Sequence, residues 1–170
     1  MNVTVLFGSK NDLDEDMRKA IRDAREAWCF DGPFHTIDVH VMSVHRNTPI
    51  CIALAANELE GVSLDDIDII IAAAGWANQL AGMMAAFLHH NGRKIPVIGL
   101  AIGTPGTKEF DAARLSIECL PGKPVILDPS GNAYANATGM RDIFLRLATE
   151  PLPQAKPYVE KPVELYVEID

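Results

Sequence analysis

The sequence predicts an α/β fold in which helices cover both faces of a five-stranded parallel sheet. Short apolar runs alternate along the chain with segments whose apolar residues recur at helical spacing, as in proteins built from strand–helix–strand units. Residues 67–74 are apolar at all but one position, which is expected of a central parallel strand covered on both sides. Short connections favour right-handed crossovers between neighbouring strands. Together these observations predict a doubly wound sheet with the strand order 2-1-3-4-5.

The first strand is expected at residues 3–7 and the first helix at residues 13–28. The apolar run of the strand is too short for a helix, and the turn-forming sequence Gly-Ser-Lys-Asn-Asp ends it. Asp12 is the expected N-cap of the helix. The acidic residues at positions 14–16 suit the positive end of the helix dipole.

The second strand is expected at residues 36–42, where apolar residues alternate with polar ones. It leads to a helix at residues 50–59, whose apolar residues form a helical stripe. Asn47 or Thr48 can cap this helix. Pro49 suits its first turn, because a backbone N–H at that position would have no partner within the helix.

The remaining elements continue the alternation. Further strands are expected at residues 67–74, 95–101 and 125–127, and further helices at residues 83–90, 110–119 and 132–148. A five-stranded sheet of this order is flavodoxin-like. Residues 1–150 are expected to form one domain. Residues 151–170 are rich in proline and are expected to form a C-terminal tail that packs on a neighbouring subunit.

Composition restricts the function classes. The chain of 170 residues has a formal net charge of −8 and no basic tract, which argues against a nucleic-acid partner. No apolar run approaches the length of a membrane span, and the N-terminus has no signal-peptide pattern, so we expect a cytoplasmic protein without membrane contact. The three cysteines are far apart and none is in a CxxC pair, so neither disulfides nor a metal site are expected.

Polar residues follow three of the expected strands. Ser43, His45 and Arg46 come directly after the second strand, and open parallel sheets bind ligands outside the carboxyl ends of their strands. The arginine suits a phosphate or carboxylate, and the histidine suits proton transfer near neutral pH. The turn at residues 8–12 and the small-residue segment at residues 75–82 end two further strands and can contribute to the same site.

Four segments resemble the motifs of the PurE family, in the order in which that family has them. They are GSKND at residues 8–12, SVHR at residues 43–46, AGWANQLAG at residues 74–82 and LSIECLPG at residues 115–122. The PurE family comprises the N5-carboxyaminoimidazole ribonucleotide mutases and the aminoimidazole ribonucleotide (AIR) carboxylases of purine synthesis. The resemblance covers roughly residues 3–147, and four motifs in order are far more specific than any one alone.

The resemblance implies roles for individual residues. Ser9 and Asp12 correspond to residues that hold the phosphate and ribose of the nucleotide, and Ser43 and Arg46 to residues that grip the phosphate. His45 corresponds to the histidine that moves a proton on and off the imidazole carbon. The residues that correspond to the loop around the base and the carboxyl group or carbon dioxide are Gly75, Ala77, Asn78 and Leu80. The family also implies a homo-octamer with sites at subunit contacts, and neither a metal nor an organic cofactor.

The third motif resembles the direct-carboxylase branch, AGRSNxLSG, at Asn78, Leu80 and Gly82. The mutase branch, AGAGGAAHLPGM, has a histidine where this chain has Gln79. We therefore expect AIR and carbon dioxide to be the productive pair. Trp76 stands where the direct carboxylases have arginine. Asn47 interrupts the SAHRTP pattern of the mutases.

These features leave two hypotheses from different classes. The first is an enzyme that forms 4-carboxy-5-aminoimidazole ribonucleotide, from AIR and carbon dioxide or from the N5-carboxylated form, with His45 as general acid/base. The second is a diverged PurE-like nucleotide-binding protein without this activity, which the replacement at Trp76 favours. A nicotinamide dehydrogenase is disfavoured, because the glycine fingerprint is absent and no acidic residue ends the second strand.

Overall fold

A five-stranded parallel sheet forms the centre of the protein in the computed structural model, which describes residues 1–29, 32–76 and 78–157. The strand order is β2-β1-β3-β4-β5, and every pairing is parallel. The strands are β1 (Asn2–Phe7), β2 (Thr36–Val41), β3 (Ile69–Ala74), β4 (Val97–Ala101) and β5 (Tyr134–Ala135). The predicted doubly wound, flavodoxin-like α/β fold is confirmed.

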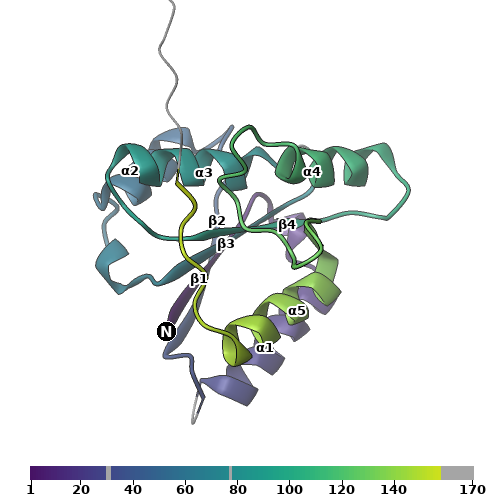
Figure 1. Ribbon diagram of the computed structural model, residues 1–170, viewed down its shortest axis with the longest axis horizontal. Helices are drawn as coiled ribbons and strands as arrows, with labels where there is room; N and C mark the ends of the chain where they lie inside the picture. Colours follow the sequence, from purple (N-terminus) through teal and green to yellow (C-terminus); the bar gives the residue numbers. More distant parts are fainter. Residues whose placement is uncertain (30–31, 77, 158–170) are drawn as a thin grey trace, which may run out of the picture.

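Helices cover both faces of the sheet, as Figure 1 shows. The helices α2 (Thr48–Ala56), α3 (Gln79–His90) and α4 (Lys108–Glu118) lie on one face, and α1 (Glu15–Trp28) and α5 (Asn136–Thr149) on the other. Each face has its own apolar core. Along β1, Val3, Val5 and Phe7 pack with the α1 and α5 core, whereas Leu6 packs with the opposite one.

The centre and the edge of the sheet differ in burial. All six residues of β3 are buried, as the apolar run predicted. The edge strand β2 is covered less completely, and Val41 at its end is 43% exposed. In the part of the chain that the structure describes, no helix is long and apolar enough to cross a membrane.

The first helix begins later than predicted. Asp12 is not its N-cap, because Lys10–Asp12 forms a short 3-10 helix that the Ser9 side chain caps. Asp14 caps α1 instead, and its Oδ1 accepts a hydrogen bond of 2.8 Å from the backbone N–H of Met17. The Asp12 side chain is thereby released from the helix end and lies at the carboxyl ends of the strands.

The other helices also differ from the prediction at their ends. The helix predicted to begin at residue 50 begins at Thr48, the one predicted at residues 110–119 is Lys108–Glu118, and the one predicted at residues 132–148 is Asn136–Thr149, because residues 134–135 form β5. The helix predicted to reach residue 59 ends at Ala56, because Asn57 adopts a left-handed conformation with φ 63° and its side chain accepts the N–H of Leu64. The helix predicted to begin at residue 83 begins at Gln79. This earlier start brings the first turn of α3 to the end of β3.

The fifth strand is not where the sequence predicted it. Residues 125–127 contribute a single parallel bridge, from Ile126 to Ile98, and β5 is Tyr134–Ala135. Pro124 has no N–H for a ladder, and after residue 127 the chain turns, with Asp128 accepting the N–H of Asn132 at 2.8 Å. This turn returns the chain to β4 for a second pairing, in which two residues of each strand are partners.

Candidate active site

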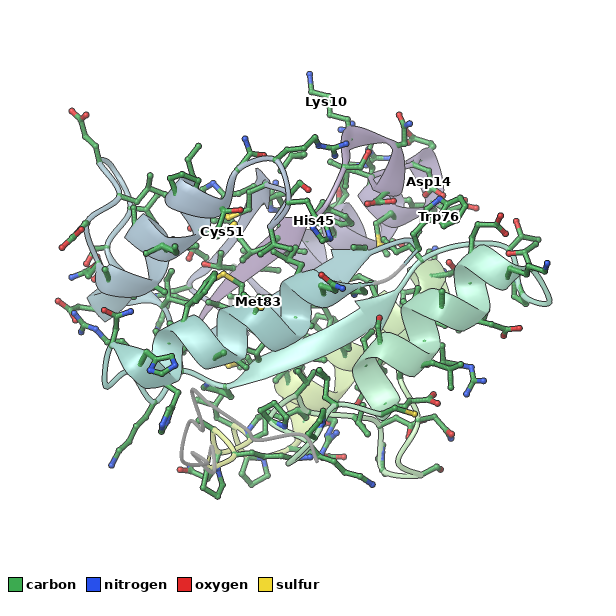
Figure 2. All side chains as sticks on the ribbon, turned by 90° about the horizontal axis from the view of Figure 1, so that it is seen from above. Lys10, Asp14, His45, Cys51, Trp76 and Met83 are labelled. Atoms are coloured by element: carbon green, nitrogen blue, oxygen red, sulfur yellow. The ribbon has the colours of Figure 1, made fainter. Side chains whose placement is uncertain are left out.

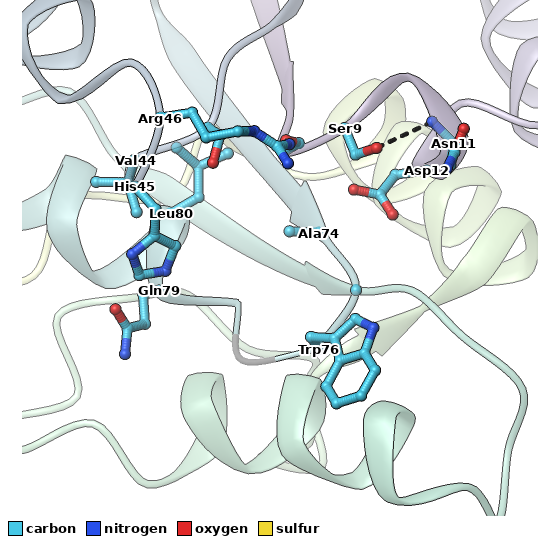
Figure 3. Close-up of a pocket in the computed structure, with 13 residues that line it drawn as sticks. Ser9, Asn11, Asp12, Val44, His45, Arg46, Ala74, Trp76, Gln79 and Leu80 are labelled. Atoms are coloured by element: carbon cyan, nitrogen blue, oxygen red, sulfur yellow. Dashed lines mark hydrogen bonds between the residues drawn. The ribbon is translucent and has the colours of Figure 1, made fainter.

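A pocket of about 500 Å³ lies outside the carboxyl ends of β1, β2 and β3. Its walls come from the loops that follow these three strands and from the start of α3 (Figure 3). This is the position at which open parallel sheets bind ligands. The lining residues are Gly8, Ser9, Asn11, Asp12, Ser43, Val44, His45, Arg46, Ala74, Gly75, Trp76, Gln79 and Leu80.

The loop after β1 forms a tight turn around Gly8. A side chain at Gly8 would place its Cβ 2.9 Å from the Cβ of Ala74, so this position requires glycine. The Ser9 hydroxyl accepts a hydrogen bond of 3.1 Å from the N–H of Asn11 (Figure 3). Lys10 of the same loop extends away from His45 and Trp76, as Figure 2 shows, and does not line the pocket.

Asp12 places a carboxyl group between the β1 and β3 loops. A Cβ built on Gly8 would lie 3.5 Å from Asp12 Oδ2, and one built on Gly75 would lie 3.4 Å from Oδ1. Partial burial raises the pKa of this carboxyl above its ordinary value, although the backbone N–H groups of Gly75 and Ser9 and the charge of Arg46 act in the opposite direction. The group is therefore easier to protonate than a carboxyl in water.

The loop after β2 is held by a pair of hydrogen bonds between its ends. The N–H of Asn47 donates to the carbonyl of Ser43 at 2.7 Å, and the N–H of Ser43 donates to Asn47 Oδ1 at 3.1 Å. Between these anchors, His45 and Arg46 have exposed side chains that line the pocket. Asn47 therefore fixes the turn that presents both residues, which accounts for its departure from the SAHRTP pattern.

Arg46 connects this turn to the loop after β1. One of its terminal nitrogens, Nη2, donates a hydrogen bond of 3.0 Å to the carbonyl of Gly8. A guanidinium has five N–H donors in a fixed fork, so one bond to the protein is compatible with an anion on the others. The side chain is thus held at the edge of the pocket in an orientation that suits a phosphate.

The loop after β3 forms the floor of the pocket and one wall. A Cβ at Gly75 would lie 3.2 Å from the carbonyl oxygen of Ile102, which leaves little space beneath the backbone. Leu80 is buried and closes the apolar side of the pocket. Trp76, in contrast, is 68% exposed and adopts a left-handed backbone conformation with φ 53°.

Asn78 does not line the pocket. Its side chain is 0% exposed, and Nδ2 donates to the carbonyls of Ala72 and Leu100 at 3.2 and 2.9 Å. It therefore ties the end of β3 to the end of β4. Within the described residues its Oδ1 has no hydrogen-bond partner. Ala77, the neighbouring candidate from the sequence, lies outside the described residues.

The structure brings most of the candidate residues into one pocket. These are Ser9, Asp12, Ser43, His45, Arg46, Gly75 and Leu80. Asn11 and Gln79, to which the sequence assigned no role, also line it, as does Trp76, which stands at the position of the arginine in the family motif. Asn11 lies in the turn at residues 8–12 and Gln79 in the segment at residues 75–82. Both segments follow predicted strands, and this position was the signal that could have identified the two residues. Across residues 1–29, 32–76 and 78–157, no group of three His, Cys, Asp or Glu side chains is arranged to hold a metal.

Comparison with known proteins agrees with these motifs. The profile of the AIR carboxylase family matches residues 2–142. The chain is 35% identical over 131 residues to a protein of Saccharolobus solfataricus named N5-carboxyaminoimidazole ribonucleotide mutase. The matched region covers 77% of this chain and 73% of that protein. The chain therefore belongs to the AIR carboxylase family, which is the PurE family that its four motifs resemble.

Proposed function

We propose that the protein forms 4-carboxy-5-aminoimidazole ribonucleotide in purine synthesis, with His45 as the general acid/base. One observation carries this proposal: His45 and Arg46 extend from one turn into a pocket that also contains Ser9 and Asp12. A nucleotide needs an anion site at one end, and its reacting carbon needs a group that can take up and release a proton at the other. The pocket offers both.

In this proposal Arg46, Ser9 and Ser43 hold the phosphate, and Asp12 accepts a hydrogen bond from the ribose. Arg46 is the principal anion ligand, because a guanidinium pairs with two phosphate oxygens at once. The hydroxyl groups of Ser9 and Ser43 add neutral donors. The roles of Gly75 and Leu80 are to bring the backbone close to the base and to exclude water from the apolar wall.

The chemical step requires one proton transfer at carbon. The C4 carbon of AIR uses a ring electron pair to form a bond to carbon dioxide, which leaves C4 bonded to both a carboxylate and a hydrogen. The neutral His45 imidazole removes that hydrogen as a proton, and the electron pair restores the aromatic ring. The proton leaves to solvent from the exposed imidazole, so the overall reaction releases one proton.

The N5-carboxylated nucleotide reaches the same intermediate, with a carboxylate and a hydrogen on C4, through a different first step. Its N5 carboxylate leaves as carbon dioxide while N5 takes a proton from protonated His45, and carbon dioxide then reacts at C4. The imidazole recovers its proton from C4, so no net proton is released. The similar protein of Saccharolobus solfataricus is named for this reaction, which supports it as the alternative route.

We propose that AIR and carbon dioxide are the productive pair. Gln79 lines the pocket at the position where the mutase motif has a histidine, and Asn78, Leu80 and Gly82 match the direct-carboxylase motif. The test uses AIR with bicarbonate and, separately, the N5-carboxylated nucleotide, and follows product absorbance. Faster turnover of the N5-carboxylated nucleotide than of AIR at saturating bicarbonate would reverse this assignment.

A nucleotide-binding protein without turnover is the second candidate, and Trp76 favours it. Its indole occupies the pocket wall, where the direct-carboxylase motif has a charged residue. Calorimetry that detected tight binding of AIR, together with no product from either nucleotide, would support this candidate.

We also propose that the protein is a homo-octamer. The helix α2, whose sequence is TPICIALAA, is apolar on all sides, yet Ile50 and Ile52 are 42% and 45% exposed. A helix of this kind is normally covered. The tail proposed to reach a neighbour lies mostly in residues 158–170, outside the described residues. Light scattering is expected to give about eight times the 18.5 kDa of one chain, and a monomer would contradict the proposal.

A further inference from the structure

We propose that Trp76 determines the specificity of the pocket by stacking its indole on the flat imidazole ring of the bound nucleotide. This inference rests on the proposed function, because it assumes a nucleotide in the pocket. Its basis is the conformation, exposure and position of Trp76.

The backbone conformation of Trp76 is costly for a large side chain. Its φ of 53° lies in the left-handed region, where Cβ approaches the following carbonyl and bulky residues are rare. Glycine adopts this conformation without strain. Strain of this kind persists where the surrounding structure imposes it, and such sites are concentrated at binding and catalytic loops. The indole is therefore expected to supply an interaction that a glycine at this position would lack.

The exposure of Trp76 excludes a role in the core. The side chain is 68% exposed, whereas Trp28, the other tryptophan, packs edge-on against Phe34 with ring centroids 5.8 Å apart. A large exposed aromatic surface beside a pocket is typical of ligand contact. Burial of the Trp76 ring against a ligand would remove this apolar surface from water.

Trp76 borders two cavities, together with Asn11, Asp12 and Gly75. It lines the pocket of about 500 Å³ and also a second pocket of about 570 Å³, whose other walls include Gly103 and Asn136. The floor below it is closed, because Gly75 is packed against the carbonyl of Ile102. A flat ring that enters the first pocket therefore meets the indole as a side wall.

The same position suits the orientation of the nucleotide. In Figure 3 the Trp76 ring lies across the pocket from Arg46, with His45 and Gln79 beside the intervening space. A nucleotide whose phosphate binds Arg46 directs its base away from that residue, toward Trp76 and the imidazole of His45. Stacking against tryptophan would then hold the ring in the plane that His45 needs for proton transfer at C4.

The test compares two ligands that share the ribose phosphate and differ in the base. AIR and ribose 5-phosphate are titrated by calorimetry into the wild-type protein, Trp76→Gly and Trp76→Phe. Loss of one base stack is expected to weaken AIR binding to Trp76→Gly by roughly 5- to 150-fold, from the usual size of such contacts. Ribose 5-phosphate should bind all three proteins within about twofold, and Trp76→Phe should be intermediate for AIR.

Two further measurements separate stacking from a structural role. In a Trp28→Phe background the fluorescence of Trp76 should change with AIR and not with ribose 5-phosphate. The thermal midpoint of Trp76→Gly should equal or exceed that of the wild type, because the substitution relieves the left-handed strain. Its mass by light scattering should be unchanged.

Several results would overturn the inference. Equal loss of AIR and ribose 5-phosphate binding would mean that Trp76 shapes the loop, and dissociation of Trp76→Gly would mean that it is a subunit contact. Normal turnover and normal AIR affinity of Trp76→Gly would show that Trp76 does not contribute to recognition of the base, and would leave the proposed function intact. Failure of the wild-type protein to bind AIR would instead contradict both.

Discussion

The loops after β2 and β3 border the same pocket but use their polar residues in opposite ways. The β2 loop directs His45 and Arg46 outward and uses Asn47 to close the turn beneath them. The β3 loop directs its polar residue, Asn78, inward to the carbonyls of Ala72 and Leu100 and leaves Trp76 at the surface. The β2 loop therefore places polar side chains in the pocket. The β3 loop instead supplies hydrogen bonds that connect β3 and β4, and an aromatic side chain at the pocket wall.

This comparison separates effects on turnover from effects on stability. Substitutions of His45 and Arg46 are expected to remove contacts to the proposed ligand and to change stability little, because both side chains are exposed. Substitution of Asn78 removes buried hydrogen bonds between two strands, which the fold requires. Substitutions in the two loops are therefore expected to change different quantities, turnover or affinity in the β2 loop and stability in the β3 loop.

The largest effect is expected for His45→Asn. Removal of a positioned acid/base should lower kcat by roughly 10²- to 10⁴-fold, while the affinity for AIR changes little, because the ring is needed to move the proton. The matched control is His40→Asn, which changes a histidine of β2 that does not line the pocket. Retention of more than about a tenth of the wild-type rate would exclude His45 from the mechanism.

Arg46→Ala should change binding instead of the chemical step. The loss of a charge-assisted contact to phosphate is worth about 1.5–3 kcal/mol, which corresponds to a roughly 10- to 150-fold higher Kd for AIR. Lys10→Ala is the control, because Lys10 is a cation of the neighbouring loop that extends away from the pocket. If calorimetry gave equal effects for both variants, Arg46 would act as a general charge and not as a phosphate ligand.

Asn78→Ala should affect the fold. The change leaves the carbonyls of Ala72 and Leu100 without this donor and is expected to lower the free energy of unfolding by about 1–3 kcal/mol. Urea denaturation measures this loss, with Gln79→Ala as a control at the adjacent, exposed position. A variant of unchanged stability that failed to bind AIR would show that the β3 loop also presents its polar side chain to the ligand.

The smallest effect is expected for Asp12→Asn and depends on pH. Because burial raises the pKa of Asp12 in the folded protein, the fold binds this proton more tightly than the unfolded chain does. The resulting stabilisation is complete below the ordinary value of 3.8 and is lost as pH rises through the folded-state pKa. Near neutral pH the ionised, partly buried Asp12 carboxylate therefore lowers the free energy of unfolding of the wild type.

Asp12→Asn should accordingly melt at a higher temperature than the wild type near neutral pH, and the difference should disappear as the pH approaches 3.8. The control Asp142→Asn makes the same charge change at an exposed position of α5. A melting-temperature difference that grew on acidification would contradict the direction of the shift.

The sequence alone predicted the features that depend on the local pattern of apolar and polar residues. The apolar run at residues 67–74 predicted a central strand, and β3 is buried at every position. The polar residues after the second strand could be assigned to a site, because strand ends share one edge of a parallel sheet. Ser43, His45 and Arg46 indeed line one pocket with Ser9 and Asp12.

Features that depend on backbone conformation or distant pairing were not predictable in this way. Asp12 and Asp14 are both suitable N-cap residues for α1. Asp14 is the N-cap because Asp12 belongs to the short 3-10 helix that the Ser9 side chain caps. Residues 125–127 have a strand pattern, but the turn at Asp128 gives the better pairing position to Tyr134. The inward direction of Asn78 follows from carbonyls on two strands, one of them 22 residues away in sequence.

The central claim is that His45 carries the proton of C4 in this pocket, and proton exchange during the reverse reaction tests it most directly. The product, 4-carboxy-5-aminoimidazole ribonucleotide, is incubated with the protein in D₂O without bicarbonate, and the AIR formed is examined by NMR. The wild type should release carbon dioxide and place deuterium at C4 well above the rate in buffer, whereas His45→Asn should fall to about the buffer rate. Deuterium incorporation by His45→Asn at the wild-type rate would contradict the account.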